Sequence, residues 1–240
     1  MDSDVIKLLL PVLNSLRAYH RHEVVGLEHV PKTGGAVVEV NHSLATYDIG
    51  MLNAAIYQEC HRYMRSMADH LFYRVPLLSQ VVEAIGAKEG NRENAKEFLK
   101  QGEMVCVAPG GMREALRPST QRYQLRWERR RGFAQIAIET QCPVLIAMCP
   151  RADDLYQVYS NPLTAWAYQK YRVPLFLARG LGLTPIPRPI KLVHFLSEPI
   201  HPPVAKTDPE AFKRQVDNFH RQLVRRAQTL IGEAIAYRGK

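Results

Sequence analysis

One short segment of this chain holds two side chains suited to acid–base chemistry, His42 and Asp48. His42 follows directly on an apolar, β-branched run at residues 36–40, and Asp48 lies six positions later. A carboxylate on one imidazole nitrogen fixes the tautomer, so that the other nitrogen can remove a proton from an attacking hydroxyl. A histidine in this role is a general base and raises a reaction rate by roughly 10²–10⁴-fold.

The spacing of these two residues sets a condition on the local structure. In a continuous α-helix six residues turn about 600°, which leaves the two side chains roughly 240° apart. His42 and Asp48 can therefore meet only if a loop follows the strand and Asp48 returns in the first turn of a helix. The alternative is a strand-end histidine held by a local hydrogen bond, with Asp48 as a plain helix cap.

A second segment of interest follows another buried run, at residues 104–108. It is a Pro-Gly-Gly turn followed by an Arg-Glu pair. Glycines let the backbone approach a ligand and present N–H groups to an anion, and an arginine suits a phosphate or a developing oxyanion. Alone this motif is weak, because an arginine after a Gly-Gly turn is usually a solvated surface group. The residues concerned are Pro109, Gly110, Gly111, Arg113 and Glu114.

Buried apolar runs alternate with helical patterns through the middle of the chain. This alternation favours an α/β fold with a largely parallel central sheet flanked by helices. Parallel strands commonly hold ligands at their carboxyl ends, so this fold brings the two segments together. The predicted strands are residues 23–27, 36–40, 62–68, 104–108, 144–149 and 190–196; the predicted helices are 91–100, 132–140 and 209–237; residues 77–85 form a short helix or strand.

The N-terminal residues 1–20 are predicted as an amphipathic helix, followed by one domain at residues 21–240. Pro11 lies within the apolar stretch and is expected to bend or break that helix. The helix could anchor the protein at a membrane interface or pack on the core of its own domain. No run of 18 uncharged apolar residues occurs, so no membrane span is expected.

The composition limits the classes of partner. The formal net charge is +9 over 240 residues, which favours an anionic partner such as an acidic membrane face, a phosphorylated substrate or nucleic acid. No nucleic-acid-binding module is recognisable, so nucleic acid is not expected. The four cysteines form no Cys-x-x-Cys pair and are interpreted as core thiols, with no metal site predicted.

Three further stretches have two interpretations each. A basic cluster could bind an anionic donor or lipid surface, although a solvated face is the simpler interpretation. Residues 173–183 could line an acyl groove, although core packing is the simpler interpretation. The two tryptophans could be anchors at a membrane interface, although the core is again the simpler interpretation. The basic cluster is Arg122, Arg126, Arg129, Arg130 and Arg131, and the tryptophans are Trp127 and Trp166.

In their order along the chain, these segments resemble the glycerolipid acyltransferase superfamily (PlsC-like, lysophospholipid acyltransferase-like). In that family an Asn-His-(x)4-Asp motif carries the base, and a later Pro-Glu-Gly-Thr-Arg segment shapes the acceptor site. Here one extra residue separates His42 from Asp48, and Gly110 stands where the family has glutamate. The Pro109–Leu116 segment is most similar to the diacylglycerol-acyltransferase-like branch. Residues 25–35, 86–92 and 142–146 also resemble family motifs.

The resemblance implies transfer of a fatty acyl group from an acyl thioester, acyl-CoA or acyl carrier protein, to a hydroxyl of a lipid acceptor. It implies no cofactor, a peripheral place on the cytoplasmic side of a membrane, and His42 and Asp48 as the catalytic pair. The substrate-binding residues it implies are Asn41, Arg92, Pro109, Gly110, Gly111, Arg113 and Glu114.

Three alternatives remain open at this stage. The acceptor could be lysophosphatidate specifically, the chain could be a non-catalytic lipid-binding scaffold, or the same base could activate water in a hydrolase. A serine hydrolase is disfavoured because the chain has no Gly-x-Ser-x-Gly elbow.

Overall fold

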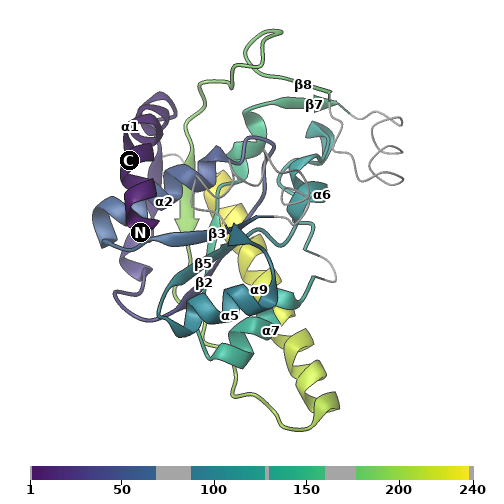
Figure 1. The fold of residues 1–240 in the computed structure, drawn as a ribbon. Helices are drawn as coiled ribbons and strands as arrows, with labels where there is room; N and C mark the ends of the chain where they lie inside the picture. Colours follow the sequence, from purple (N-terminus) through teal and green to yellow (C-terminus); the bar gives the residue numbers. More distant parts are fainter. Residues whose placement is uncertain (1, 69–87, 128–129, 160–176, 238–240) are drawn as a thin grey trace.

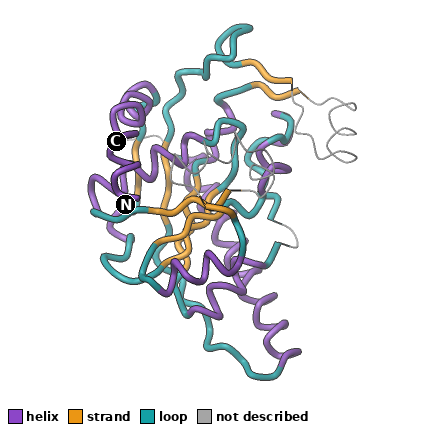
Figure 2. The backbone as a smooth tube through the Cα atoms, in the orientation of Figure 1, coloured by secondary structure: helices purple, strands orange, loops and turns teal. Residues whose placement is uncertain are grey.

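A seven-stranded, mostly parallel sheet forms the centre of the protein, in the order β1-β9-β6-β2-β5-β3-β4 (Figures 1 and 2). The computed structural model describes all residues except 1, 69–87, 128–129, 160–176 and 238–240. The strands are β1 (Glu23–Val25), β2 (Ala36–Val40), β3 (Met64–Ala68), β4 (Lys88–Glu89), β5 (Met104–Val107), β6 (Val144–Met148) and β9 (Val193–Leu196).

Helices cover both faces of the sheet, so the predicted α/β fold is confirmed. The side chains of β2 alternate between the faces, as the twofold period of a strand requires. Val37 packs in a core cluster with α5 (Arg92–Lys100), α7 (Gly132–Thr140) and α9 (Pro209–Ala236), while Val38 packs on the α2 (Tyr47–Cys60) side.

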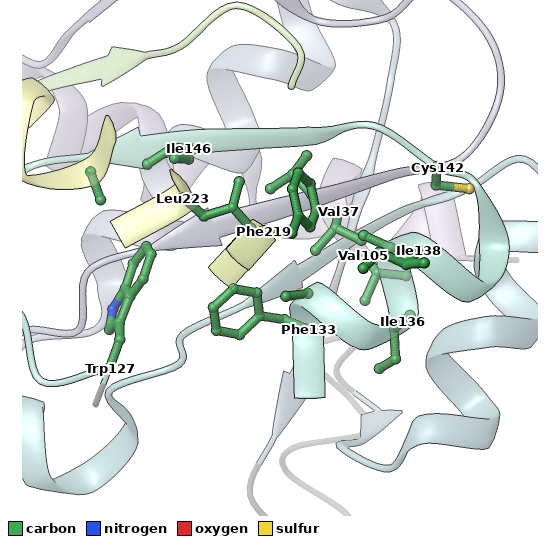
Figure 3. Packing of buried hydrophobic residues seen from close by; sticks show 14 of the residues in the cluster. Val37, Val105, Trp127, Phe133, Ile136, Ile138, Cys142, Ile146, Phe219 and Leu223 are labelled. Atoms are coloured by element: carbon green, nitrogen blue, oxygen red, sulfur yellow. The ribbon is translucent and has the colours of Figure 1, made fainter. Parts of the chain in front are cut away.

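Figure 3 shows the first of these clusters, in which Trp127, Phe133, Phe219 and Leu223 fill the space between the sheet and its helices. Trp127 is 1% exposed, which confirms its predicted place in the core, whereas Trp166 lies outside the described residues. The four cysteines are free thiols and three of them are buried.

Local signals fix the ends of several helices. Asn91 caps α5, where its side chain accepts a hydrogen bond from the Asn94 N–H at 2.8 Å. Asp208 caps α9 by accepting from the Ala211 N–H at 2.7 Å, with Pro209 in the first helical position. These are the side-chain oxygens and the proline position that the start of a helix favours.

The N-terminal helix α1 (Asp2–Tyr19) continues through Pro11, so a break at this residue does not occur. Ile6 and Leu13, on either side of Pro11, are both buried and pack with Ala54 of α2. Packing on both sides of the proline offsets the one backbone hydrogen bond that it removes. Leu8 and Val12 of the same helix are exposed, so the helix presents apolar side chains to both the core and the surface.

Two features of the sheet differ from the expected parallel order. β9 pairs in parallel with β1 but antiparallel with β6, so this edge pair runs against the other strands. A separate antiparallel pair, β7 (Gln157–Tyr159) with β8 (Leu177–Arg179), lies outside the main sheet. The prediction for residues 77–85 falls outside the described residues.

Strand β8 and the turn after it are not core, in contrast to the expectation for residues 173–183. Leu177, Leu181 and Leu183 are 58%, 51% and 86% exposed, and residues 173–176 lie outside the described chain. Backbone hydrogen bonds from Gly180 to Thr184 and from Leu181 to Ile186 shape the turn that carries Leu181 and Leu183. Among the described helices, none combines the length and the hydropathy that crossing a bilayer requires.

Candidate active site

His42 lies in the loop that follows β2, and its ring is held in one tautomer. Its Nδ1 lies 3.0 Å from the carbonyl oxygen of Ser43. Because a carbonyl can only accept, Nδ1 carries the proton and Nε2 keeps its lone pair. Burial lowers the pKa of His42, partly opposed by the bond to Ser43, so the ring is neutral at neutral pH. A neutral imidazole with a free Nε2 is the form that a general base needs.

Asp48 lies in the first turn of α2, as predicted, and is 1% exposed. Its Oδ1 accepts a hydrogen bond from the Ser43 hydroxyl at 3.1 Å. A turn with Thr46 at a φ of 59° brings the chain back to the loop. Asp48 and His42 are therefore joined through Ser43: the hydroxyl of this residue binds the aspartate and its carbonyl binds the histidine.

The direct contact between Asp48 and His42 that the spacing suggested is replaced by this link through Ser43. The second oxygen of Asp48, Oδ2, has no hydrogen-bond partner among the described residues. Burial raises the pKa of Asp48 to about 7, and the bond from Ser43 opposes that rise. Ser43 was not singled out in the sequence, because a serine inside a motif carries no signal of its own.

Asn41 joins the ends of two neighbouring strands. Its amide donates to the Cys149 carbonyl at 3.1 Å and accepts from the Cys149 N–H at 2.7 Å. The side chain is buried, so water does not compete for either hydrogen bond. Asn41 was expected among the substrate-binding residues, but in this arrangement it fixes the start of the His42 loop against the end of β6.

Glu114 ties the two sequence motifs together. Its Oε1 accepts from the His42 N–H at 2.9 Å and its Oε2 accepts from the Arg126 N–H at 2.8 Å. The carboxylate is completely buried and burial raises its pKa, which Arg117 opposes. Glu114 was expected to bind substrate. In the structure its carboxylate bonds the His42 N–H and so positions the backbone of the His42 loop.

Gly110 explains how Glu114 fits. A Cβ built on Gly110 would overlap the Glu114 carboxylate and its Cβ. Where the family motif has a glutamate, this chain has a glycine. The space next to this glycine is filled by the side chain of Glu114, four residues later. Gly110 is buried in a right-handed backbone conformation, so the close approach, and not its dihedral angle, is what requires glycine.

The remaining turn residues are held by backbone bonds. Gly111, at a φ of +51°, donates its N–H to the Ala108 carbonyl at 3.0 Å. That N–H is already bonded, although it was expected to bind an anion. The Pro109 carbonyl accepts from Arg130 at 3.0 Å, and the same guanidinium would clash with a side chain at Gly111.

A buried ion pair that the sequence did not indicate supports the turn. The Arg117 Nε donates to Asp153 Oδ2 at 3.0 Å, and the Arg117 side chain also bonds the Glu114 carbonyl at 3.2 Å. Both partners of the ion pair are less than a tenth exposed. A small pocket adjoins this pair and the His42 loop; it is lined by Leu44, Ala115, Arg117, Pro118, Ser119, Arg122, Ala152, Asp153, Tyr156 and Val158.

The other predicted cations lie at the surface or are engaged in the fold. Arg92 and Arg113 are exposed, at the first residue of α5 and within α6 (Gly111–Ala115). Within the basic cluster, Arg122 pairs with Asp154 and Arg131 with Asp217. Arg126 bonds Gln121, and Arg129 falls outside the described residues.

Asp48, Cys149 and His194 bring their potential ligand atoms within 4.8 Å of one another, deep in the protein. This is the spacing of a metal site, but the chemistry of the thiol does not fit. Burial raises the pKa of Cys149 well above its usual range, and the nearby Asp48 raises it further. A thiol must lose its proton to bind a metal. We therefore interpret the three side chains as a buried polar cluster.

Two relatives of this chain, from human and mouse, share one name. The chain is 32% identical over 183 residues to the human "DGAT1/2-independent enzyme synthesizing storage lipids", covering 76% of this chain and 54% of the relative. The mouse protein of the same name is 31% identical over 215 residues, covering 89% and 63%. The chain thus spans little more than half the length of these relatives.

A solved structure shares the fold. The 1-acyl-sn-glycerophosphate (LPA) acyltransferase PlsC from Thermotoga maritima superposes with a TM-score of 0.53 at 18% identity, covering 93% of this chain and 81% of that one. At this identity the match speaks for the fold alone. The model of the family named Acyltransferase matches residues 21–149, more than half of the chain. The chain belongs to the Acyltransferase family.

Proposed function

We propose that this chain is an O-acyltransferase. It moves a fatty acyl group from an acyl thioester, acyl-CoA or acyl carrier protein, to a hydroxyl of a glycerolipid or related lipid acceptor. The observation that carries the proposal is the state of His42, whose Nδ1 bonds the Ser43 carbonyl at 3.0 Å and leaves Nε2 as the basic nitrogen. A neutral base at the end of a central strand suits proton removal from an alcohol.

In the proposed reaction, His42 Nε2 takes the proton of the acceptor hydroxyl as its oxygen attacks the thioester carbonyl carbon. A C–O bond forms and the C–S bond breaks. The proton on Nε2 then passes to the departing thiolate, so the enzyme returns to its starting state without an acyl-enzyme intermediate. Asp48 is proposed to stabilise the transient imidazolium through Ser43.

A neutral lipid is the acceptor that we favour. The relatives at 32% and 31% identity are named for storage-lipid synthesis. In this chain Glu114 is buried and the Gly111 N–H is bonded to Ala108, so the turn offers few groups to an acceptor phosphate. Arg113 is exposed near the turn and is the residue that a lysophosphatidate acceptor would use.

We further propose peripheral binding to the cytoplasmic face of a membrane. The apolar side chains of Leu181, Leu183 and Ile186 project from one turn. The Tyr19 hydroxyl donates to the Pro187 carbonyl at 2.7 Å, which ties this turn to the end of α1. The net charge of +9 favours an anionic surface, and exposed apolar groups can enter its interface.

The test is an acyl-transfer assay with purified protein and labelled acyl-CoA or acyl carrier protein. The acceptors are lysophosphatidate, other lysophospholipids, monoacylglycerol, diacylglycerol and a long-chain alcohol. His42→Ala should lower the rate by about 10²–10⁴-fold without unfolding the protein. His201→Ala, which changes an exposed histidine far along the chain, is the matched control and should retain activity.

Each outcome of this assay has a distinct meaning. Product on a neutral acceptor supports the proposal, and product on lysophosphatidate alone supports the lysophospholipid alternative. Thiol release without acylated product identifies a hydrolase. No thiol release with either donor contradicts the proposed reaction and favours a lipid-binding scaffold. Full activity in a folded His42→Ala variant contradicts the role of His42 as the base.

A further inference from the structure

Two buried histidines adjoin Asp48, one directly and one through the other. His194 belongs to β9 and is 1% exposed; His22 immediately precedes β1 and is 9% exposed. The parallel pairing of β1 with β9 brings them together, so that His22 Nε2 lies 2.9 Å from His194 Nδ1. The proposed reaction assigns neither histidine a role.

The tautomers of both rings follow from one fixed donor. The Arg17 Nε donates to His22 Nδ1 at 3.3 Å, and an arginine can only donate. His22 Nδ1 is therefore the acceptor and His22 Nε2 carries the proton. That proton goes to His194 Nδ1, so His194 in turn carries its proton on Nε2. The donors therefore follow one another in one order, from Arg17 to His22 and from His22 to His194.

The last donor faces Asp48. His194 Nε2 lies 3.9 Å from Asp48 Oδ2, the oxygen that has no hydrogen-bond partner among the described residues. This distance is longer than a hydrogen bond, but both side chains are 1% exposed, and in so buried a place a carboxylate still attracts a nearby N–H dipole strongly. The same tautomer also excludes His194 Nε2 as a metal ligand, because a ligand nitrogen must be free of its proton.

We propose that Arg17, His22 and His194 are positioning residues for the proposed acyl transfer, forming a directional chain of donors that keeps Asp48 ionised and in place. Arg17 is anchored by Gln58 at 2.7 Å, near the end of α2, the helix that holds Asp48 in its first turn. Asp48 passes the effect on to Ser43, and Ser43 to His42. The inference rests on the proposed function.

The surroundings of Asp48 explain why it needs such support. Burial raises its pKa to about 7, so its ionised form is finely balanced at neutral pH. Burial lowers the pKa of His22 to about 3 and that of His194 well below its usual range, so both rings stay neutral donors. The groups that face Asp48 are Ser43 and His194 as donors, and Asp153, Tyr47, Cys106 and Cys149 as titratable neighbours.

The test is the pH dependence of acyl transfer between pH 5 and 9. His194→Phe removes the donor, so the acidic limb of the rate profile should move up by about one pH unit, a tenfold loss at the pH where the wild type is half active. His194→Gln keeps an N–H donor and should restore most of the wild-type profile. His220→Phe, a buried histidine of α9 against Phe133, is the matched control and should not move the limb.

A measurement without activity separates the two proposals. Ring ¹⁵N shifts should place the proton of both His22 and His194 on Nε2 in the wild type. Arg17→Met removes the fixed donor and should mix the tautomers, while Arg21→Met, at an exposed position, should leave them unchanged. Correct tautomers in an inactive wild type contradict the proposed function alone; a different tautomer, or an unmoved acidic limb in folded, active His194→Phe, overturns the donor chain.

Discussion

The side chain that Gly110 lacks would occupy the space that the Glu114 carboxylate fills. Gly110→Ala should therefore push Glu114 off the His42 and Arg126 N–H groups, lower the free energy of unfolding by about 1–3 kcal/mol and reduce activity. In a Glu114→Gly background the same change should cost less than about 0.5 kcal/mol, because glycine removes both the carboxylate and the Cβ that a Cβ at Gly110 would overlap. Urea unfolding of the four proteins in this double-mutant cycle gives the coupling.

Gly232→Ala provides the control for this cycle. A Cβ at Gly232, inside α9, meets nothing within 4 Å. This variant should gain about 0.4–1 kcal/mol, since alanine lowers the entropy of the unfolded chain. Equal costs of Gly110→Ala with and without Glu114 would show that the two residues do not compete for space.

Asn41 should matter for stability more than for substrate affinity. Asn41→Ala leaves the buried N–H and carbonyl of Cys149 without their partner, which should cost about 1–3 kcal/mol for each group. Asn41→Asp keeps the acceptor for the N–H and should cost less. Thermal unfolding and the KM for each substrate distinguish the roles: a stable variant with a raised KM would assign Asn41 to substrate binding.

Glu39 makes stability depend on pH in a defined direction. Its side chain is completely buried, neither oxygen has a hydrogen-bond partner among the described residues, and burial raises its pKa well above the usual range. The folded protein thus holds a proton that the unfolded chain releases above about pH 4.3. The stability that this proton supports is full below that pH and falls as pH rises toward the folded pKa.

Glu39→Gln removes this pH dependence. The variant should match the wild type near pH 4 and exceed it in free energy of unfolding at pH 7, as denaturant titrations at the two pH values would measure. Glu198→Gln, at an exposed position, should change little at either pH. A variant that is less stable at pH 7 would reveal a partner that needs the Glu39 carboxylate.

The exposed turn should contribute to membrane binding. Replacing Leu181 and Leu183 with serine should weaken sedimentation with vesicles that contain anionic lipid. Covering a leucine side chain fully contributes about 1.5–3 kcal/mol to the free energy of binding. Replacing Val204, an exposed valine outside this turn, is the control. Unchanged sedimentation would place the membrane contact elsewhere.

Much of the fold could be predicted because its signals are local. The β-branched run of β2 has all five residues buried, and α7 has the predicted ends at Gly132 and Thr140. The interruption expected at Pro11 did not occur, because packing on α2 outweighs a local rule. The antiparallel edge at β9 was not predicted, since strand direction there depends on contacts with residues far away in the sequence.

Within the site, the positions of His42 and Asp48 followed from the motif, but their connection did not. Ser43 links them by its backbone carbonyl and its hydroxyl together, and no residue pattern encodes a carbonyl. Glu114 was expected among the substrate-binding residues, whereas it is buried by contacts with the His42 and Arg126 backbones. Those contacts exist only once the strands are side by side.

The pairing of β1 with β9 joins residues near position 24 to residues near position 194. A ribosome must therefore complete most of the chain before this edge of the sheet can close, and closing so long a loop is slow. The nascent protein can assemble the His42 loop and the bond from the His42 N–H to Glu114 earlier, from β2, β5 and β6. Until β9 is made, His194 is missing from its place beside Asp48. A chain interrupted during synthesis would therefore carry His42 and Asp48 without the donor chain proposed to position Asp48.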